Sequence, residues 1–177
     1  VESLPELENI SALAAQEGVT ARVAFRINPN IDAHTHAKIT TGLSENKFGL
    51  APEDLLPAIR RAQELPSVEY AGLHFHIGSQ IQDLEVYATL CHYINNLLND
   101  LAAAGIATAS VNVGGGLGID YVHPKENPIP PFEKYFNIFR HELRLPASCQ
   151  LHFELGRSIV GQCGTLIART LYVKEGR

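Results

Sequence analysis

The sequence predicts an α/β protein with parallel strands, built as part of a (β/α)8 barrel of the TIM type. Segments rich in apolar and β-branched residues alternate with segments whose apolar residues recur at helical spacing. Glycine-containing loops follow several of the strand-like segments. About four or five strand–helix units fit into the 177 residues, whereas a closed barrel needs eight units and roughly 250 residues. We therefore expect about half of a barrel.

The first two helices have clear start signals. A capping box with a proline in the first turn, Ser3–Glu6, begins one helix, and Gly18 ends it. Its expected apolar stripe is Leu4, Leu7, Ile10, Leu13 and Ala14. The second helix is expected from Pro52 to about Glu64, because Pro-Glu-Asp favours a first turn. Its expected inward residues are Leu55, Leu56, Ile59 and Ala62.

The remaining elements follow from the same periodicities. Two more helices are expected, one over residues 84–104, ended by Gly105, and one over residues 132–141 after a proline-rich surface loop. Strands are expected over residues 22–27, 68–77, 108–113 and 149–154, and residues 164–173 are strand-like. A short β-like segment is expected at 47–50, after a polar loop over 32–45 that contains His34 and His36. Long loops in compact domains are often functional.

Composition excludes several classes of protein. The chain is 45% hydrophobic and 19% charged with a net charge of −5, which argues against nucleic acid or an anionic membrane as the main partner. No apolar run approaches the roughly 20 residues of a membrane span. Cys91, Cys149 and Cys163 lack metal-ligand spacing, so we expect free thiols in a reducing compartment and a cytoplasmic protein. The absence of methionine and the strand-like ends lead us to expect a fragment.

A glycine triplet follows the third predicted strand. The apolar residues 111–113 run directly into Gly114, Gly115 and Gly116. Without Cβ atoms, three such N–H groups can converge on an anion, of which phosphate is the usual one. The spacing fits neither G-x-G-x-x-G nor a P-loop, because Ile119 and Tyr121 stand where glycine is needed. A strand-end phosphate loop and a merely tight turn both remain open.

Two histidines lie two residues apart at the end of the second long strand. His74 and His76 therefore face the same side of the sheet. We interpret His74 as a hydrogen-bonded core histidine. His76 is nearer the carboxyl end, where barrel active sites gather, and Gly78-Ser79 follows it as a natural phosphate ligand.

An acidic and a basic residue follow the fourth strand. Glu154 stands where the strand meets its loop, and Arg157 comes three residues later. A buried carboxylate needs a cationic partner, so one interpretation is an ion pair between these two. The other has Glu154 facing a cationic ring nitrogen and Arg157 facing a phosphate or carboxylate. Arg26 and Asn28 either line the same site or cap neighbouring loops, and Lys47 is expected at the surface or an interface.

Five segments in order resemble the fold-type III pyridoxal-phosphate-dependent decarboxylases. They are Arg26–Pro29, Thr41-Gly42 with Glu45–Gly49, His74–Gln80, Gly114–Ile119 and Glu154–Ser158. The resemblance implies a barrel of the alanine racemase type that holds pyridoxal 5′-phosphate, a β-rich second domain and a homodimer. Residues 1–160 would be part of the barrel, and residues 161–177 would cross over into the C-terminal β domain.

The resemblance also implies roles for individual residues. His76 would stack on the pyridine ring, and Glu154 would pair with the ring nitrogen, which makes these two the expected catalytic residues. The phosphate would be held by Ser79, Gly114, Gly115, Gly116 and Arg157, and Gly156 would also bind the cofactor. Arg157 would also bind the amino-acid substrate. No metal is expected. The family usually has proline where Leu155 stands, and none of Lys38, Lys47, Lys125, Lys134 or Lys174 matches the lysine that bonds the cofactor. We expect that lysine upstream of Val1, so the chain alone should be inactive.

The residues of two motifs favour one reaction within this family. Glu45–Gly49 and His76–Gln80 favour decarboxylation of meso-2,6-diaminopimelate to L-lysine and CO2. Arginine, ornithine or carboxynorspermidine decarboxylation is the near alternative. A metal-dependent barrel hydrolase, with His74, His76, His152 and Glu154 as ligands, and a non-catalytic homologue are the more distant ones.

Overall fold

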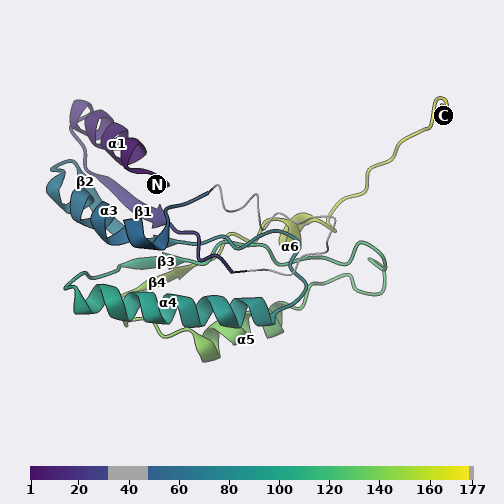
Figure 1. The fold of residues 1–177 in the computed structure, drawn as a ribbon. Coiled ribbons are helices and arrows are strands. Elements are labelled where there is room, and N and C mark those ends of the chain that lie inside the picture. The colour runs from purple at the N-terminus through teal and green to yellow at the C-terminus, as the bar shows by residue number, and fades with distance from the viewer. Residues whose placement is uncertain (32–47, 176–177) are drawn as a thin grey trace.

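A computed structural model describes residues 1–31 and 48–175 of the chain. Its elements in order are α1 (Leu4–Gln16), β1 (Ala21–Arg26), α3 (Pro52–Glu64), β2 (Val68–His74), α4 (Glu85–Ala103), β3 (Ser110–Asn112), α5 (Phe132–Glu142), β4 (Gln150–His152) and α6 (Arg157–Val160). Within these ranges the strands form one parallel sheet in the order β1-β2-β3-β4. All strands point their carboxyl ends toward the side where α6 lies (Figure 1). The predicted parallel β/α architecture is confirmed.

Helix α1 begins as the capping box predicts. The Ser3 hydroxyl accepts a hydrogen bond from the Glu6 N–H at 3.3 Å, and Gly18 follows the helix with a φ of 66°. The buried face is Leu7, Ser11 and Ala14. Leu4 and Leu13 of the predicted stripe are 42% and 61% exposed, because α1 packs along one edge of the sheet and buries only a narrow face.

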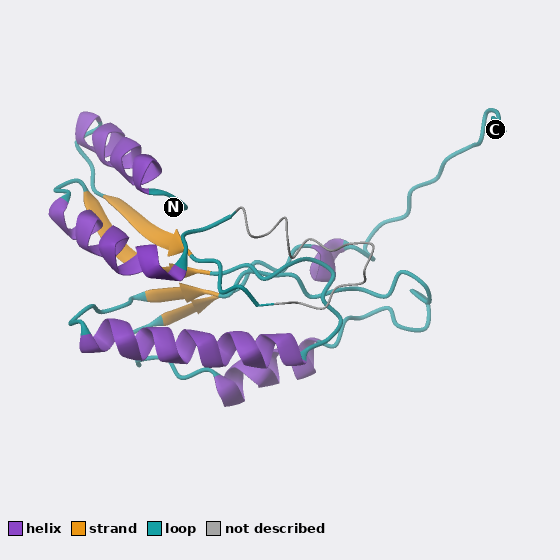
Figure 2. Ribbon diagram, viewed as in Figure 1, coloured by secondary structure: helices purple, strands orange, loops and turns teal. Residues whose placement is uncertain are grey.

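The other predicted helices are present with nearly the expected bounds. Helix α3 has the bounds predicted, and it buries Leu55, Ile59 and Ala62, with Ala58 in place of the expected Leu56. Helices α4 and α5 lie against each other and cover β3 and β4 (Figure 2). A cluster of aromatic rings fills this contact: Tyr87, Tyr135, Phe136, Phe139 and Phe153. None of the helices in the described ranges is long and apolar enough to cross a membrane.

The strands end earlier than the sequence predicted. Regular pairing stops at His74, Asn112 and His152, although single backbone hydrogen bonds continue beyond it. The Phe75 N–H donates to the Asn112 carbonyl at 2.8 Å, and the Val113 N–H donates to the His152 carbonyl at 3.0 Å. The glycine-rich loops that follow break the ladder, since their backbones leave extended geometry. The last residue of each strand is therefore polar and lies directly before a loop.

The residues 164–173 form no strand in the described part of the chain. They run away from the sheet as an extended segment (Figure 1), and Leu166 and Ile167 are 94% and 90% exposed. A strand needs a neighbour to pair its backbone groups. Residues 164–173 have the apolar alternation of a strand, but no neighbouring strand pairs with them among the described residues.

The outer edge of β1 is paired at its carboxyl half. The Val1 amino group donates to the Ala24 carbonyl at 2.8 Å, and the Arg26 N–H donates to the Val1 carbonyl at 2.9 Å. These bonds place Val1 beside β1 as a parallel neighbour. This pairing agrees with the strand-like character that the sequence shows at Val1.

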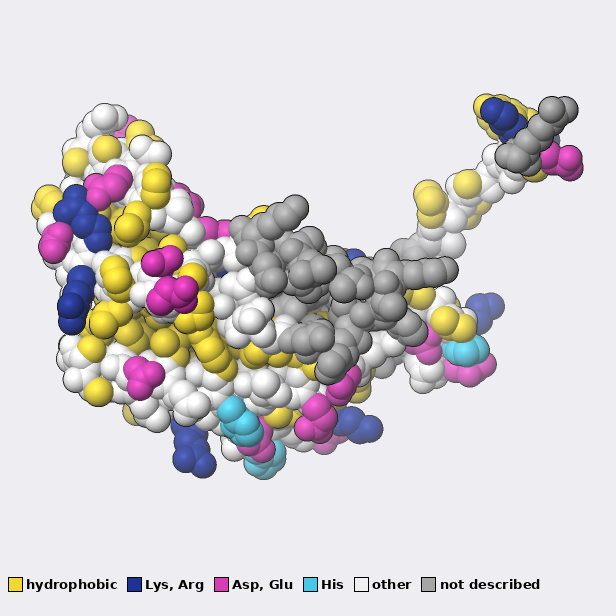
Figure 3. Space-filling model, viewed as in Figure 1, with side chains coloured by type: hydrophobic (Ala, Val, Ile, Leu, Met, Phe, Trp, Pro, Cys, Tyr) yellow, Lys and Arg dark blue, Asp and Glu magenta, His cyan; other side chains and the backbone are white. Residues whose placement is uncertain are grey.

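The two faces of the sheet differ in chemistry. Phe25, Leu73 and Val111 point to one face and are fully buried under the helices. Hydrophobic side chains gather between α1, α3 and α4, with charged side chains around them (Figure 3). The other face carries a polar row at the strand ends, whose register neighbours are Arg26, His74, Asn112 and His152. Burial of the apolar face fixes the strands, and so places this row.

Candidate active site at the carboxyl ends of the strands

Glu154 is the centre of the polar group at the strand ends. Its Oε2 lies 3.2 Å from Nε2 of His74, and its Oε1 accepts a hydrogen bond from Nδ2 of Asn112 at 2.9 Å. An ionised carboxylate can only accept, so His74 donates through Nε2. Residues from β2, β3 and the loop after β4 therefore meet at one carboxylate.

The electrostatics keep this carboxylate ionised. Partial burial raises the pKa of Glu154, but the charge and hydrogen bond of His74 outweigh it, helped by Asn112 and the charge of His76. The net pKa lies below the ordinary glutamate value. The side chain is 54% exposed. Glu154 is charged and open to a ligand.

His74 is hydrogen-bonded, as its interpretation expected, but its partner is the Glu154 carboxylate at the strand ends and not a group of the core. Its side chain is 22% exposed and bonds Glu154. The two-residue spacing places His74 on the same face as His76, but it does not reveal the contact with Glu154, which follows another strand. Asn112 was missed for a similar reason, since it precedes the glycine triplet by two positions and was treated only as part of the strand.

The glycine triplet packs three loops together. Gly114 and Gly116 have φ values of 71° and 93°, which strongly favour glycine. A Cβ at Gly114 would collide with the Phe75 carbonyl oxygen, and one at Gly116 with the Gly78 carbonyl oxygen. A Cβ at Gly115 would collide with the carbonyl oxygen of Glu154. The triplet is therefore a tight turn that lies directly against the loops carrying His76 and Glu154.

The carbonyl groups of this turn are used by the protein. The Ile81 N–H donates to the Gly116 carbonyl at 2.8 Å, and the buried Tyr87 hydroxyl donates to the Gly115 carbonyl at 3.2 Å. The N–H groups of Gly115 and Gly116 have no hydrogen-bond partner among the described residues. The turn is thus anchored through its oxygens while two of its donors remain available.

The loop after β4 leads into a short helix that the sequence analysis did not predict. Helix α6 begins at Arg157, directly after Gly156. The Ser158 hydroxyl is buried and, within the described ranges, lacks a hydrogen-bond partner. The predicted phosphate ligand Ser79 and the predicted cofactor-binding residue Gly156 are exposed. The Gly-Arg-Ser sequence after a strand was the only signal for this turn.

Among the described residues, Arg157 and Glu154 contact different partners. Its Nη1 donates to Oε1 of Gln80 at 3.3 Å, and its guanidinium lies 5.9 Å from the centroid of the Tyr121 ring. Gln80 also accepts from the Ile119 N–H at 3.2 Å and donates to the Ile119 carbonyl at 2.5 Å. The interpretation of Glu154 and Arg157 as an ion pair is therefore wrong for the described structure, where their partners differ.

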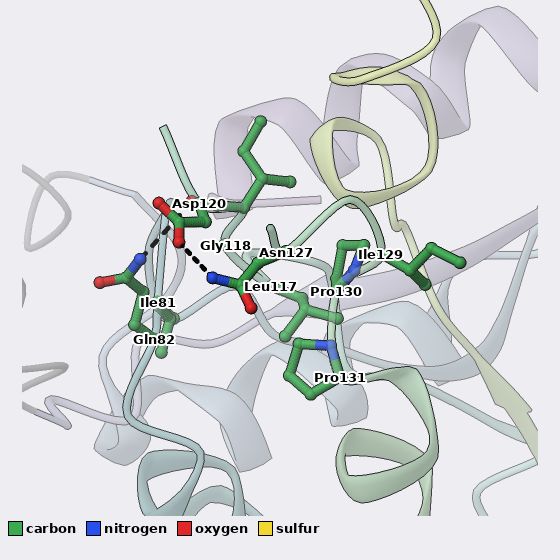
Figure 4. A pocket seen from close by; sticks show the side chains of 10 residues that line it. Ile81, Gln82, Leu117, Gly118, Asp120, Asn127, Ile129, Pro130 and Pro131 are labelled. Atoms are coloured by element: carbon green, nitrogen blue, oxygen red, sulfur yellow. Dashed lines mark hydrogen bonds between the residues drawn. The ribbon is translucent and has the colours of Figure 1, made fainter. Parts of the chain in front are cut away.

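A cavity of about 280 Å³ borders the continuation of the glycine loop. It is lined by Ile81, Gln82, Leu117, Gly118, Ile119, Asp120, Asn127, Ile129, Pro130 and Pro131. At its edge Asn127 points its amide toward Asp120 (Figure 4), donating at 2.8 Å. The His123 N–H, Asn127 and the Val122 N–H together lower the pKa of Asp120. None of the predicted cofactor-binding residues lines this cavity. The cavity is therefore next to the candidate site and not part of it.

The remaining candidate residues either have partners away from Glu154 or lie outside the described residues. Arg26 lies in the polar row and donates to Glu2 at 3.0 Å, with its guanidinium 5.0 Å from the Phe48 ring centroid. His34, His36, Lys38, Lys47 and the segments Thr41-Gly42 and Glu45–Lys47 lie outside the described residues. In the described ranges, no group of three or more His, Cys, Asp or Glu residues is arranged to hold a metal ion.

Comparison with known proteins shows the family to which the chain belongs. The family model described as "Pyridoxal-dependent decarboxylase, pyridoxal binding domain" matches residues 1–161. The diaminopimelate decarboxylase of Bacteroides thetaiotaomicron is 53% identical over 99% of this chain and 46% of its own length. That of Archaeoglobus fulgidus is 41% identical over 99% of this chain and 42% of its own length. The chain thus spans less than half of these relatives.

Solved structures share the fold. The diaminopimelate decarboxylase from Helicobacter pylori, complexed with L-lysine, has a TM-score of 0.78 at 38% identity, covering 90% of this chain and 39% of that one. A lysine/ornithine decarboxylase from Vibrio vulnificus has a TM-score of 0.67 at 24% identity, covering 90% and 38%, which shows the fold alone. The chain belongs to the family of pyridoxal-dependent decarboxylases, and residues 1–161 correspond to the pyridoxal-binding domain of that family.

Proposed function

We propose that this chain is the cofactor-binding part of a decarboxylase that converts meso-2,6-diaminopimelate to L-lysine and CO2. The observation that supports the proposal is the Glu154 carboxylate, which is ionised and bound by His74 and Asn112. It lies beside a glycine turn in which two N–H groups have no partner among the described residues. The full-length protein that contains this chain is called the parent protein below.

The residues present fit pyridoxal phosphate. A phosphate needs several N–H or hydroxyl donors, and Gly115, Gly116 and the buried Ser158 hydroxyl have hydrogen-bonding capacity unused by the described protein. Ser79, Gly114 and Arg157 complete the proposed phosphate ligands, and Gly156 also binds the cofactor. A protonated pyridine nitrogen needs an anionic acceptor, and Glu154 is ionised at neutral pH. The donor set and the acceptor come from loops in direct contact.

When bound, pyridoxal phosphate supplies the electron sink for the carbanion left by departing CO2. Glu154 holds a proton on the ring nitrogen, because a negative charge beside it favours the protonated form. The two donors to Glu154 keep its carboxylate oriented and charged. We assign His76 to stacking on the ring, which fixes the ring plane relative to the substrate.

We assign Arg157 to the substrate carboxylate as well as to the phosphate region. Its guanidinium is positioned by Gln80 and Tyr121 and has donors beyond the one that it gives to Gln80. A planar guanidinium recognises a carboxylate through paired hydrogen bonds. Diaminopimelate carries two carboxylates, so one remains for such recognition when the other is lost.

The relatives favour this substrate over others. Proteins named diaminopimelate decarboxylase are up to 53% identical to the chain, and the Helicobacter pylori structure at 38% identity was solved with L-lysine. The lysine/ornithine and arginine decarboxylase structures are 24% and 20% identical, and so support the fold only.

The remaining features are proposed for the parent protein. The cofactor-bonding lysine lies outside this chain, residues 161–177 lead into a C-terminal β domain, and the enzyme is a cytoplasmic homodimer. The expectation that the chain alone is inactive follows from the missing lysine.

The test is a direct assay of the parent protein. Purified protein loaded with pyridoxal phosphate is given meso-diaminopimelate, L-ornithine or L-arginine, and CO2 and amine products are measured. We expect L-lysine and CO2 from diaminopimelate alone. Preferred turnover of ornithine or arginine would refute the substrate assignment, and no turnover of any amino acid would refute the decarboxylase assignment.

A further inference from the structure

Asn112 forms hydrogen bonds to both halves of the proposed cofactor site. Its Oδ1 accepts from the Gly114 N–H at 2.8 Å, and its Nδ2 donates to Oε1 of Glu154 at 2.9 Å. The Glu154 N–H in turn donates to the Gly114 carbonyl at 2.7 Å. These three bonds close a ring that joins the loops after β3 and β4.

The orientation of the Asn112 amide is fixed by its partners. The Gly114 N–H can only donate, and the ionised Glu154 carboxylate can only accept. A flipped amide would set donor against donor and oxygen against oxygen. Only one orientation satisfies both neighbours, so the side chain acts as a rigid link.

The backbone of Asn112 is fixed as well. It is the last residue of β3, in register between His74 of β2 and His152 of β4. Its carbonyl accepts from the Phe75 N–H at 2.8 Å. A group on a strand is placed more accurately than one on a loop. The position of Asn112 is thus set by the sheet and passed on to both loops.

We propose that Asn112 is a positioning residue that fixes the separation between the glycine turn and the Glu154 carboxylate. The inference rests on the proposed function, in which the turn binds the cofactor phosphate and Glu154 binds the ring nitrogen. A ligand held at two ends gains most when the two sites already have the right span. Asn112 sets that span without needing to touch the ligand.

The Asn112 amide supplies both a donor and an acceptor, whereas an ionised carboxylate supplies acceptors only. An aspartate at this position keeps an acceptor for the Gly114 N–H. It loses the donor to Glu154 and places a second negative charge against it, which opposes ionisation of Glu154. The substitutions Asn112→Asp and Asn112→Ala therefore separate the two contacts.

The chain offers a matched control in Asn95 of α4. Its Nδ2 donates to the Glu142 carbonyl at 2.7 Å, and its Oδ1 accepts from the Arg144 N–H at 2.8 Å. Asn95 thus also joins two segments through both ends of its amide, in the α4–α5 contact. Asn95→Ala removes the same number of hydrogen bonds away from the strand ends.

The experiment titrates the apo form of the parent protein with pyridoxal phosphate and with pyridoxal, which lacks the phosphate. Thermal unfolding of every variant is measured in parallel. We expect Asn112→Ala to weaken pyridoxal phosphate binding about 10-fold or more, as expected for a lost hydrogen bond to a charged group. Asn112→Ala should also reduce the ratio between the affinity for pyridoxal phosphate and the affinity for pyridoxal. Asn112→Asp should weaken both ligands by a similar factor, because the phosphate loop keeps its acceptor. Asn95→Ala should leave both affinities within about twofold.

Each outcome decides a separate claim. If the unmodified protein binds neither ligand, the proposed function fails. If it binds pyridoxal phosphate and Asn112→Ala binds it equally well, the positioning role is wrong. The role is also wrong if Asn95→Ala weakens binding as much as Asn112→Ala does, since the effect would then be general destabilisation. Should Asn112→Ala not fold, unchanged affinity in Asn112→Asp would refute the inference.

Discussion

The imidazole of His74 lies 3.2 Å from the carboxylate of Glu154, although 80 positions separate the two residues in the sequence. The contact exists because β2 and β4 are parallel to β3 and end at the same level. A similar pair, His92 and Glu142 at 2.9 Å, joins α4 and α5 on the helix side. This second pair has the same chemistry but lies outside the site, so it provides a control for the first.

Replacement of Glu154 tests the role of the carboxylate. Glu154→Gln keeps the shape of the side chain and removes its charge, so the ring nitrogen loses its anionic partner. We expect kcat of the parent protein to fall by about 100-fold or more, as for the loss of one preorganised electrostatic group. Glu142→Gln, in the control pair, should leave kcat unchanged. Equal activity of Glu154→Gln and the unmodified protein would contradict the assignment.

Replacement of Arg157 tests substrate binding. In Arg157→Ala the guanidinium held by Gln80 is lost, and we expect KM for diaminopimelate to rise about 10-fold or more. Cofactor retention during dialysis should also fall. Arg140→Ala is the control, because Arg140 is an exposed arginine that donates to the Asn137 amide oxygen at 3.2 Å. If both variants give the same KM, Arg157 has no substrate role.

Alanine at Gly116 tests the glycine turn. Gly116 has a φ of 93°, and a Cβ there would collide with the Gly78 carbonyl. Gly105 has a φ of 76°, but a Cβ there meets nothing within 4 Å. Gly105→Ala therefore measures backbone strain alone, about 1 kcal/mol in the free energy of unfolding, and Gly116→Ala should cost more and also weaken phosphate binding. Equal losses in denaturant unfolding, with unchanged cofactor affinity, would show that the turn tolerates side chains.

Replacement of Tyr87 tests whether the hydrogen bond from α4 to the Gly115 carbonyl supports the glycine turn. Tyr87→Phe leaves the Gly115 carbonyl without its buried donor, and we expect a loss of about 1 kcal/mol in stability together with weaker pyridoxal phosphate binding. Tyr70→Phe removes a comparable hydroxyl contact, to Thr108 at 3.1 Å, and should affect stability alone. Unchanged cofactor affinity in Tyr87→Phe would show that the turn does not depend on this contact.

Stability at low pH follows from Glu154. Because its folded pKa lies below the ordinary value of about 4.3, ionised Glu154 stabilises the folded state above that pH. This contribution is lost as the pH falls through the folded pKa. Glu154→Gln should therefore flatten the acid side of the curve of unfolding free energy against pH, measured in denaturant between about pH 3 and 6. A variant with the same acid slope as the unmodified protein would refute the lowered pKa.

The fold could be predicted from the sequence, but only part of the candidate site could. Apolar periodicity located α3, α4 and α5 closely, because burial against the sheet decides these helices. It could not reveal that residues 164–173 have no neighbouring strand among the described residues, since pairing depends on a partner that periodicity does not show. The same limit explains the exposed Leu13 on α1.

For the candidate site, the sequence pointed to individual residues more than to the contacts between them. Glu154, His76 and the glycine triplet were identified from their places at strand ends. The contact between Glu154 and His74 was not predicted, because it depends on the register between strands. Asn112, Gln80 and Tyr87 were missed as site residues, since each acts by supporting a loop that lies beyond its own element.

The protonation state of the bound ring tests the account most directly. Pyridoxal phosphate labelled with 15N in the ring is bound to the parent protein, and its nitrogen resonance is measured by NMR with and without Glu154→Gln. The account predicts the resonance of a protonated ring nitrogen in the unmodified protein and that of a neutral pyridine in the variant. A neutral ring in the unmodified protein, or the same resonance in both, would contradict the pairing of Glu154 with the cofactor.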